Sequence, residues 1–289
     1  MAAVRRPRTM EPLQRRVEQI DRRLEAVIEP IEPGVLQQEV RQLTLAGGKR
    51  VRPAVAMLVC EACAGDADLA VDVGVAVELV HTASLVIDDI IDRAPMRRGE
   101  ESGWRRFGHG PAIVDSDALL GAAFELLRGT PVAMEQVAAA MVRLGEGEAM
   151  ELLEPPTDEA SYIELARRKT GALFRAAAEV GAVAGGADAE VVDLFGAYAE
   201  SVGIAFQIRD DVLDRTAGTE QLGKPAGQDV MMDRPSMVEV TDRSPEEATA
   251  LARAYAAEGI EALDATGIEQ GGPYEYLHDL AEFVVIRGR

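Results

Sequence analysis

Two long windows without proline dominate this sequence of 289 residues. No proline occurs between Pro53 and Pro95 or between Pro156 and Pro225, and proline inside a helix would remove a hydrogen bond and clash with the preceding turn. Ala, Val and Leu abound, while aromatic residues make up 4% of the chain. Small, straight-chain residues suit close-packed helices, and the alternation typical of strands is almost absent. The sequence therefore predicts an all-α protein.

Further helix signals flank these windows. Apolar residues recur at helical steps near the N-terminus: Leu13, Val17, Ile20, Leu24 and Val27. Ser244 and Glu247 have the spacing of a capping box, with Pro245 at the first helical position. Residues 93–110, rich in Arg and Gly, are expected to form a loop. Because no linker or repeat is visible, we expect one domain over residues 1–289. It would be a bundle of long helices around a central, deep cavity, with residues 1–10 flexible.

Two acidic clusters of the form DDxxD lie near the ends of these windows, at residues 88–92 and 210–214. Because positions i and i+4 of a helix share a face, Asp88 and Asp92 should point the same way, and so should Asp210 and Asp214. Other polar residues extend these two faces: Glu78, His81 and Ser84, and then Glu200, Gly203 and Gln207. Polar stripes on buried helices are costly unless they line a hydrated or ligand-filled cavity.

The paired clusters indicate a metal site. Neighbouring carboxylates repel one another and need a cation, and their hard oxygen atoms suit Mg²⁺, which completes its octahedron with water and phosphate oxygens. A single cluster would more simply be a solvated helix end. Two clusters with the same spacing, each after a buried helix, favour the metal site, with Asp88, Asp92, Asp210 and Asp214 as candidate ligands.

Basic residues that could bind a phosphate ligand surround the clusters. Residues 47–53 read GGKRVRP, a glycine-led cationic turn in which the backbone can approach a ligand and arginine can bind diphosphate through two nitrogens. The other candidates are Arg97 and Arg98 after the first cluster, Lys169 with Thr170 within a helix, and Lys224 after the second cluster. Each alone could be a solvated side chain, so the prediction rests on the set.

These motifs together resemble the trans-type isoprenyl diphosphate synthases. GGKRVRP, the HTASLVIDDIID block with its following RRG, KTGALF, and GIAFQIRDDVLD with its following LGKPAGQD match that family in order and spacing. The resemblance extends from about residue 40 to the C-terminus. It implies the isoprenoid synthase fold, a homodimer, Mg²⁺ as cofactor, and condensation of isopentenyl diphosphate with an allylic diphosphate.

The resemblance also implies residue roles. Isopentenyl diphosphate would be held by Lys49, Arg52, His81 and Arg98. Asp88, Asp92 and Asp210, supported by Asp214, would hold the Mg²⁺ ions that bridge to the allylic diphosphate. Arg97, Lys169 and Lys224 would neutralise that leaving group, and Thr170 and Gln207 would face the developing carbocation. No nucleophilic Ser, Cys or His is required, because metals and fixed cations stabilise the departing diphosphate.

The chain departs from the family pattern at several positions. Gly147-Glu148 stands where Gly-Gln is common. Residues 233–236, Asp-Arg-Pro-Ser, replace a late Gly-Lys-x-Thr motif whose lysine helps to bind diphosphate. Arg234 keeps the positive charge of that lysine but not the shape of its side chain. The departure therefore weakens the expectation of efficient turnover, whereas the expected fold is unaffected.

Small residues before the first aspartate predict a long product. In this family, large aromatic residues four or five positions before that aspartate stop growth at fifteen carbons, and here these positions are Ser84 and Ala83. Val80 lies one turn below Ser84, and each open helical turn adds about 5.4 Å of depth. We expect a product of twenty carbons or more, geranylgeranyl diphosphate first. Alternatively, Phe124 on a facing helix closes the cavity.

Two other functions compete with this interpretation. A class I terpene cyclase also ionises an allylic diphosphate, but usually pairs DDxxD with a different second metal motif. A non-catalytic subunit of a prenyl diphosphate synthase would share the fold, but typically loses one aspartate cluster. Both clusters are present here.

The net charge and the cysteine content limit the binding partners and the cellular compartment that we expect. A formal net charge of -20 disfavours nucleic acid and anionic membranes. No apolar segment follows the basic N-terminus, and no uninterrupted apolar run of membrane-spanning length is apparent, so stable membrane insertion is not expected. Cys60 and Cys63 form a CxxC pair that we interpret as small core residues. We expect a cytoplasmic protein.

Overall fold

The computed structural model describes residues 11–216 and 236–286. Helices make up almost all of the regular structure in that part, which confirms the all-α prediction. In chain order the elements are α1 (Glu11–Ile28), α2 (Gly34–Leu45), α3 (Val51–Ala62), α4 (Ala67–Ile91), β1 (Met96–Arg97), β2 (Glu100–Glu101), α5 (Gly103–Phe107), α6 (His109–Leu127), α7 (Pro131–Leu153), α8 (Glu159–Ala166), the π-helical turn η1 (Arg167–Gly171), α9 (Ala172–Ala184), α10 (Ala189–Thr216), α13 (Met237–Val240), α14 (Pro245–Ala265) and α15 (Gly272–Ile286).

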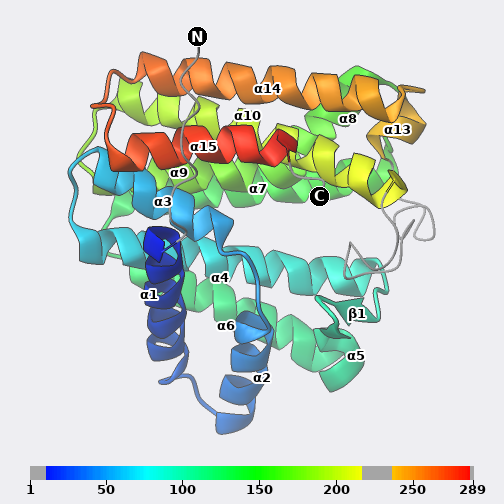
Figure 1. Ribbon diagram of the computed structural model, residues 1–289. Helices are drawn as coiled ribbons and strands as arrows, with labels where there is room; N and C mark the ends of the chain where they lie inside the picture. The colour runs from blue at the N-terminus through cyan, green and yellow to red at the C-terminus, as the bar shows by residue number, and fades with distance from the viewer. Residues whose placement is uncertain (1–10, 217–235, 287–289) are drawn as a thin grey trace.

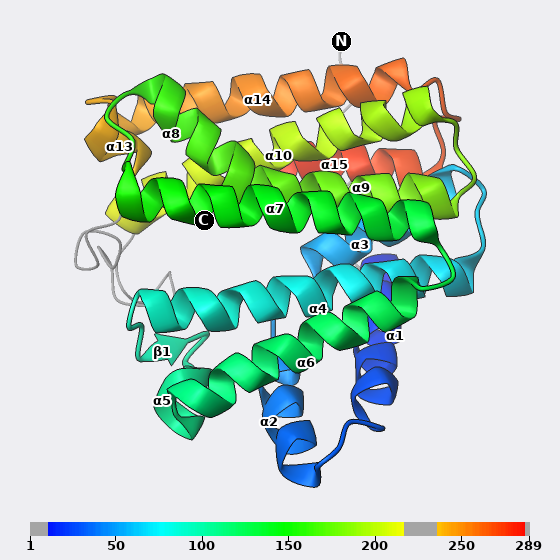
Figure 2. The same cartoon turned by 180° about the vertical axis from the view of Figure 1, so that it is seen from behind.

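The long helices lie side by side in a bundle. Helix α10 packs against α14, α9 and α15, while α4 packs against α3, α6 and α9. Figures 1 and 2 show α4 and α10 running in the same direction, so that the ends of both helices lie at the same side of the molecule. This arrangement brings the two acidic clusters, which end α4 and approach the end of α10, to one end of the bundle.

Local sequence signals explain where several helices begin. Asp66 caps α4, since its side chain accepts hydrogen bonds from the backbone nitrogens of Asp68 and Leu69, both at 2.9 Å. Helix α14 begins with the predicted capping box: Ser244 and Glu247 exchange hydrogen bonds, and Pro245 is the first helical residue.

The amphipathic stripe predicted near the N-terminus lies on α1. Its fully buried face consists of Ile20, Leu24 and Ile28, with Val17 and Val27 partly buried beside it. The side chain of Leu13 lies outside the described residues.

Helices α3 and α9 pack closely at a glycine. A Cβ on Gly181 of α9 would lie 2.3 Å from the carbonyl oxygen of Ala56, so only glycine allows α3 and α9 to approach this closely.

The CxxC pair lies at the end of α3. Cys60 is buried, Cys63 is partly buried, and both are free thiols. Burial raises the pKa of Cys60 to about 11, which keeps its thiol protonated and unreactive. The interpretation of these cysteines as core residues is confirmed.

The segment 93–110 is more ordered than the predicted loop. It forms the antiparallel ribbon β1–β2, the short helix α5 and the start of α6. Both the Ser102 hydroxyl, at 2.6 Å, and the Trp104 indole nitrogen, at 2.9 Å, donate to the carbonyl oxygen of Ala94. These two hydrogen bonds fold the segment back onto the end of α4, which sequence composition alone did not indicate.

Helices α4 and α10 are long and apolar enough, by length and composition, to cross a membrane. The apolar windows are 67% buried in α4 and 56% buried in α10, as in the core helices of a bundle. No uninterrupted apolar run of membrane-spanning length is expected from the sequence, and these two helices reach that length with a few charged residues among the apolar ones.

Candidate active site

A cavity of about 860 Å³ lies where the two acidic clusters meet. Asp88 from α4 and Asp210 from α10 both line it, so two clusters more than a hundred residues apart share one site, as predicted from the sequence. Apolar side chains form much of the remaining wall: Leu85, Leu144, Leu165, Leu173, Phe174 and Phe206. The cavity therefore combines carboxylates with a surface that excludes water.

The last aspartate of each cluster does not line this cavity. Asp92 is the C-cap of α4, one residue beyond the last helical residue, and Asp214 is buried in α10 with 4% of its surface exposed. The backbone nitrogen of Asp92 still donates the helical hydrogen bond to the carbonyl oxygen of Asp88 at 2.8 Å, so the two residues stay one turn apart on α4. The assignment of Asp92 and Asp214 as metal ligands stays a prediction.

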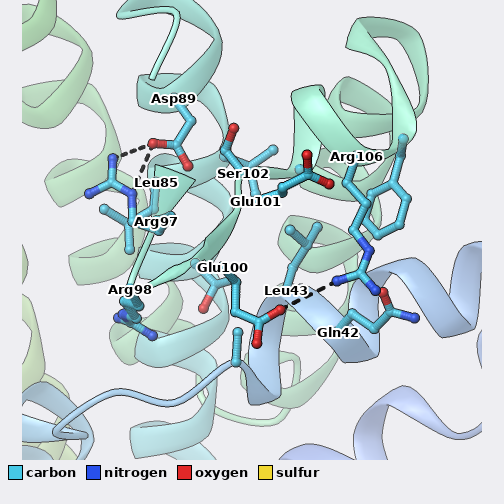
Figure 3. A pocket seen from close by; sticks show the side chains of 15 residues that line it. Gln42, Leu43, Leu85, Asp89, Arg97, Arg98, Glu100, Glu101, Ser102 and Arg106 are labelled. Atoms are coloured by element: carbon cyan, nitrogen blue, oxygen red, sulfur yellow. Dashed lines mark hydrogen bonds and ion pairs between the residues drawn. The ribbon is translucent and has the colours of Figure 1, made fainter. Parts of the chain in front are cut away.

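The second aspartate of the first cluster orients the β1–β2 ribbon. Asp89 is buried, and its Oδ1 accepts hydrogen bonds from Arg97 Nε at 2.9 Å and Arg97 Nη2 at 2.5 Å. Figure 3 shows this pair on one side of the ribbon and the ion pair of Arg106 with Glu100, at 3.6 Å, on the other. Arg97 also borders the main cavity, so its guanidinium is held at the cavity edge by an aspartate that the sequence analysis had left without a role.

Arg52 is a partly buried cation that also lines the cavity. Its Nη1 lies 3.1 Å from His81 Nε2, and its guanidinium lies 4.6 Å from the centre of the Phe174 ring. Burial lowers the pKa of Arg52 to about 10, which leaves it charged at pH 7. Burial, followed by the charge of Arg52, holds the pKa of His81 well below its ordinary value. His81 is therefore neutral and orients Arg52 without adding a charge.

The glycine-led turn before α3 supports two further cations. Gly47 and Gly48 have φ of 89° and 143°, and a Cβ on Gly48 would lie 2.7 Å from Arg98 Nη1. Arg98 Nη1 donates to the carbonyl oxygen of Gly47, so its guanidinium lies directly on the turn. Lys49 and Arg98 both line the cavity. The predicted basic residues Lys49, Arg52 and Arg98 thus form one cationic wall.

Arg50, within the same turn, has a structural position that the sequence analysis missed. It is 4% exposed, adopts a left-handed backbone with φ of 49°, and pairs with Glu78 at 2.6 Å and Asp21 at 2.9 Å. Its Nη2 also donates to the carbonyl oxygen of Thr44 at 2.7 Å. Arg50 therefore joins α1, α2 and α4 beneath the turn, and Glu78 serves this ion pair.

Lys169 stands between carboxylates on α7. Its Nζ lies 2.8 Å from Glu148 Oε2 and also pairs with Glu151. Burial alone would lower the pKa of Lys169, but the charges of Glu151, Asp88 and Glu148 outweigh burial and raise it above its ordinary value. The ammonium is therefore permanently protonated beside Asp88.

A hydrogen-bond chain connects the cavity to the second cluster. Thr170 Oγ1 donates to Gln207 Oε1 at 2.8 Å, and Gln207 Nε2 donates to Asp211 Oδ1 at 2.9 Å. Asp211 Oδ2 accepts from the hydroxyl of Tyr162 at 2.5 Å and from the backbone nitrogen of Met237 at 2.8 Å. The structure brings Thr170 and Gln207 together, as predicted, and adds Asp211 and Tyr162. Tyr162 precedes Lys169 by seven residues, two helical turns, and this spacing could have indicated a shared face.

The residues proposed to set product length separate into two groups. Ser84 lines the cavity, whereas Val80 and Ala83 are buried in the core and do not. Ala83 lies against α6, since its carbonyl oxygen accepts a hydrogen bond from Ser116 Oγ at 3.2 Å. Leu144 and Leu173 line the cavity together with Ser84, and the chain-length role of Ala83 and Val80 stays a prediction. Phe124, the alternative barrier, packs against the core and does not line the cavity.

Two predicted cations, Lys224 and Arg234, lie outside the described residues. Among the residues that the structure does describe, the donor set fits a divalent metal with a diphosphate. Carboxylate oxygens of Asp88 and Asp210 are the hard ligands that Mg²⁺ prefers. Across the cavity, Arg52 Nε is buried without a hydrogen-bond partner, which is the arrangement expected of a donor that awaits an anion.

Comparison with known proteins shows the family to which the chain belongs. The family model described as polyprenyl synthetase matches residues 33–266. A putative geranylgeranyl pyrophosphate synthase 8 of Arabidopsis thaliana is 39% identical over 239 residues, covering 75% of this chain and 66% of the plant protein, just under two thirds. The short chain isoprenyl diphosphate synthase of Methanothermobacter thermautotrophicus is 35% identical, covering 94% of this chain and 88% of that protein.

The fold is shared with a solved structure. A polyprenyl synthase from Caulobacter crescentus, complexed with calcium and isoprenyl diphosphate, superposes with a TM-score of 0.88 at 27% identity, covering 97% of this chain and 99% of that one. Helical fold and paired acidic clusters define an isoprenoid synthase-like protein. The chain belongs to the polyprenyl synthetase family. It is an enzyme of the prenyltransferase class.

Proposed function

We propose that this enzyme condenses isopentenyl diphosphate with an allylic diphosphate, head to tail, to give a trans-polyprenyl diphosphate. The observation that supports this most is that one cavity is lined by carboxylates and by a set of cations. Asp88, Asp210 and Lys169 line it, and we assign them to an acidic end; Lys49, Arg52 and Arg98 line it too, and we assign them to a cationic end. Two diphosphates can therefore be bound at the same time, with their carbon chains between apolar walls.

The acidic end is assigned to the allylic diphosphate. Asp88 and Asp210 would hold Mg²⁺ there, and the metal supplies the positive charge that stabilises diphosphate as it leaves. Lys169 adds a fixed positive charge at the same end. Thr170 and Gln207 present oxygen atoms toward the cavity that can stabilise the allylic cation left behind.

The cationic end is assigned to isopentenyl diphosphate. Arg52, fixed by His81 and Phe174, and Lys49 and Arg98, fixed by the glycine turn, would orient its double bond toward the allylic cation. The double bond attacks the cation to form the new carbon–carbon bond, and a proton then leaves to the departed diphosphate. Leu144, Leu173 and Phe206 exclude the water that would trap the cation.

Geranylgeranyl diphosphate is the proposed product. The small side chain of Ser84 lines the cavity, and Leu144 and Leu173, which also line it, are aliphatic side chains that can change rotamer. The name of the Arabidopsis relative supports the same product length. A homodimer in the cytoplasm is also proposed. The compartment is supported by the free thiols Cys60 and Cys63, and fractionation of cells would test it.

A primer and product assay tests the function. The protein is incubated with isopentenyl diphosphate, Mg²⁺ and either dimethylallyl, geranyl or farnesyl diphosphate, and product mass is measured. A twenty-carbon diphosphate from all three primers is expected. A dominant fifteen-carbon product would contradict the length, release of a hydrocarbon would indicate a terpene cyclase, and activity only with a second protein would indicate a non-catalytic subunit.

A further inference from the structure

Glu148 occupies a position where the family resemblance leads us to expect glutamine, and it contacts Lys169. Lys169 Nζ lies 2.8 Å from Glu148 Oε2 and also pairs, more closely, with Glu151. The three side chains are only 19%, 15% and 14% exposed in the order Lys169, Glu148, Glu151. Two carboxylates thus share one ammonium, and the group of three bears a net negative charge at the end of the cavity assigned to a diphosphate.

Packing at Gly147 explains why this contact forms. A Cβ on Gly147 would lie 2.9 Å from Arg168 Cβ and 3.0 Å from Lys169 Cγ. The stem of Lys169 therefore rests directly on the backbone of α7, in the wide π-helical turn η1. Glu148 and Glu151, one and four residues beyond Gly147, then flank the ammonium.

The two carboxylates differ in where they stand. Glu151 lines the cavity beside Lys169, whereas Glu148 does not. A ligand in the cavity can exchange contacts with Glu151, but the attraction of Glu148 acts from behind, away from the cavity. The two side chains are partly shielded from solvent, so their attraction is weakened less by water and salt than that of an exposed pair.

We propose that Glu148 is a positioning residue that sets the affinity for the allylic diphosphate. It holds the Lys169 ammonium against α7 and offsets its charge, so the diphosphate binds more weakly than it would beside an uncharged residue. This inference rests on the proposed function only in assigning this end of the cavity to the allylic substrate.

Glu148→Gln tests it, because glutamine keeps the shape and removes the charge. Calorimetric titration with inorganic diphosphate and Mg²⁺ should show about 5-fold tighter binding than in the wild type, the size expected for one partly shielded ion pair. The KM for the allylic diphosphate should fall by a similar factor, while the KM for isopentenyl diphosphate stays unchanged. Glu148→Asp, which keeps the charge, should remain close to the wild type.

Glu146→Gln is the matched control. It removes the same charge from the same helix, but from a partner of Arg168 at 2.9 Å whose side chain is 51% exposed. The inference would be overturned if Glu148→Gln bound diphosphate no more tightly than the wild type, or if Glu146→Gln gained as much affinity.

Consumption of isopentenyl diphosphate by the wild type is measured in parallel. If the wild type consumes none, the proposed function fails, but the comparison of diphosphate affinities still decides the role of Glu148.

Discussion

At the scale of single residues, Arg50 shows how a residue that borders the cavity can also hold the surrounding helices together. Its ion pair with Glu78 is almost fully buried, with exposures of 2% and 3%. Arg50→Gln leaves the Glu78 charge buried without its partner, and such changes cost about 3–5 kcal/mol. Urea denaturation should show this loss in the free energy of unfolding. Arg41→Gln is the control, because its pair with Glu25 is 60% and 49% exposed and should cost less than about 1 kcal/mol. Equal losses in the two variants would contradict the structural role.

Also at the residue scale, the buried carboxyl group of Asp115 should make the free energy of unfolding depend on pH. Its side chain is fully buried in α6, and burial, followed by the charge of Glu39, raises its pKa to about 7. The folded protein therefore holds this proton at a pH where the unfolded chain has lost it. Stability should fall as pH rises from about 4, the ordinary value for Asp, to about 7. Asp115→Asn should be more stable than the wild type at pH 8, with a difference that shrinks toward pH 4. Thermal unfolding across that range measures it, and a constant difference would contradict the assignment.

At the scale of elements, helical periodicity predicted much of the site but not how the helices pack. The spacing of the clusters indicated that Asp88 and Asp210 would share one cavity, and the capping box located the start of α14. Periodicity could not show that Ser84 lines the cavity while Ala83 is buried in the core, because that depends on how neighbouring helices pack.

The two faces of α4 predict different outcomes for two adjacent substitutions. Ser84→Phe adds a ring at the cavity wall and should shorten the main product by at least one isoprene unit, measured by product mass. Ala83→Phe places a ring in the packed core, where overpacking costs about 1–3 kcal/mol, and should lower the unfolding temperature with little change in product length. Shortening by Ala83→Phe alone would show that the cavity extends along the other face of α4.

At the scale of the whole molecule, exposed apolar side chains on α6 and α7 support the proposed homodimer. Ile113 and Val114 on α6 and Val132 and Val142 on α7 are 46–62% exposed, and we propose that these side chains belong to the dimer interface, since apolar surface is often buried where subunits meet. Val142→Glu should convert a dimer to a monomer, measured by light scattering after size-exclusion chromatography. Ile286→Glu on α15, where the side chain is 73% exposed, should leave the mass unchanged. A monomeric wild type, or a dimer that survives Val142→Glu, would contradict this surface.

The central claim is that Asp88 and Asp210 act on one diphosphate in one site. The most direct test is a double-mutant cycle on kcat/KM for condensation with Asp88→Asn, Asp210→Asn and both together. Residues that act as a unit are strongly non-additive. We expect each single change to lower kcat/KM by at least about 100-fold, because it removes a group that stabilises the charge of the leaving diphosphate. The double variant should be hardly worse than either single variant. Losses that multiply in the double variant would show two independent sites and contradict the account.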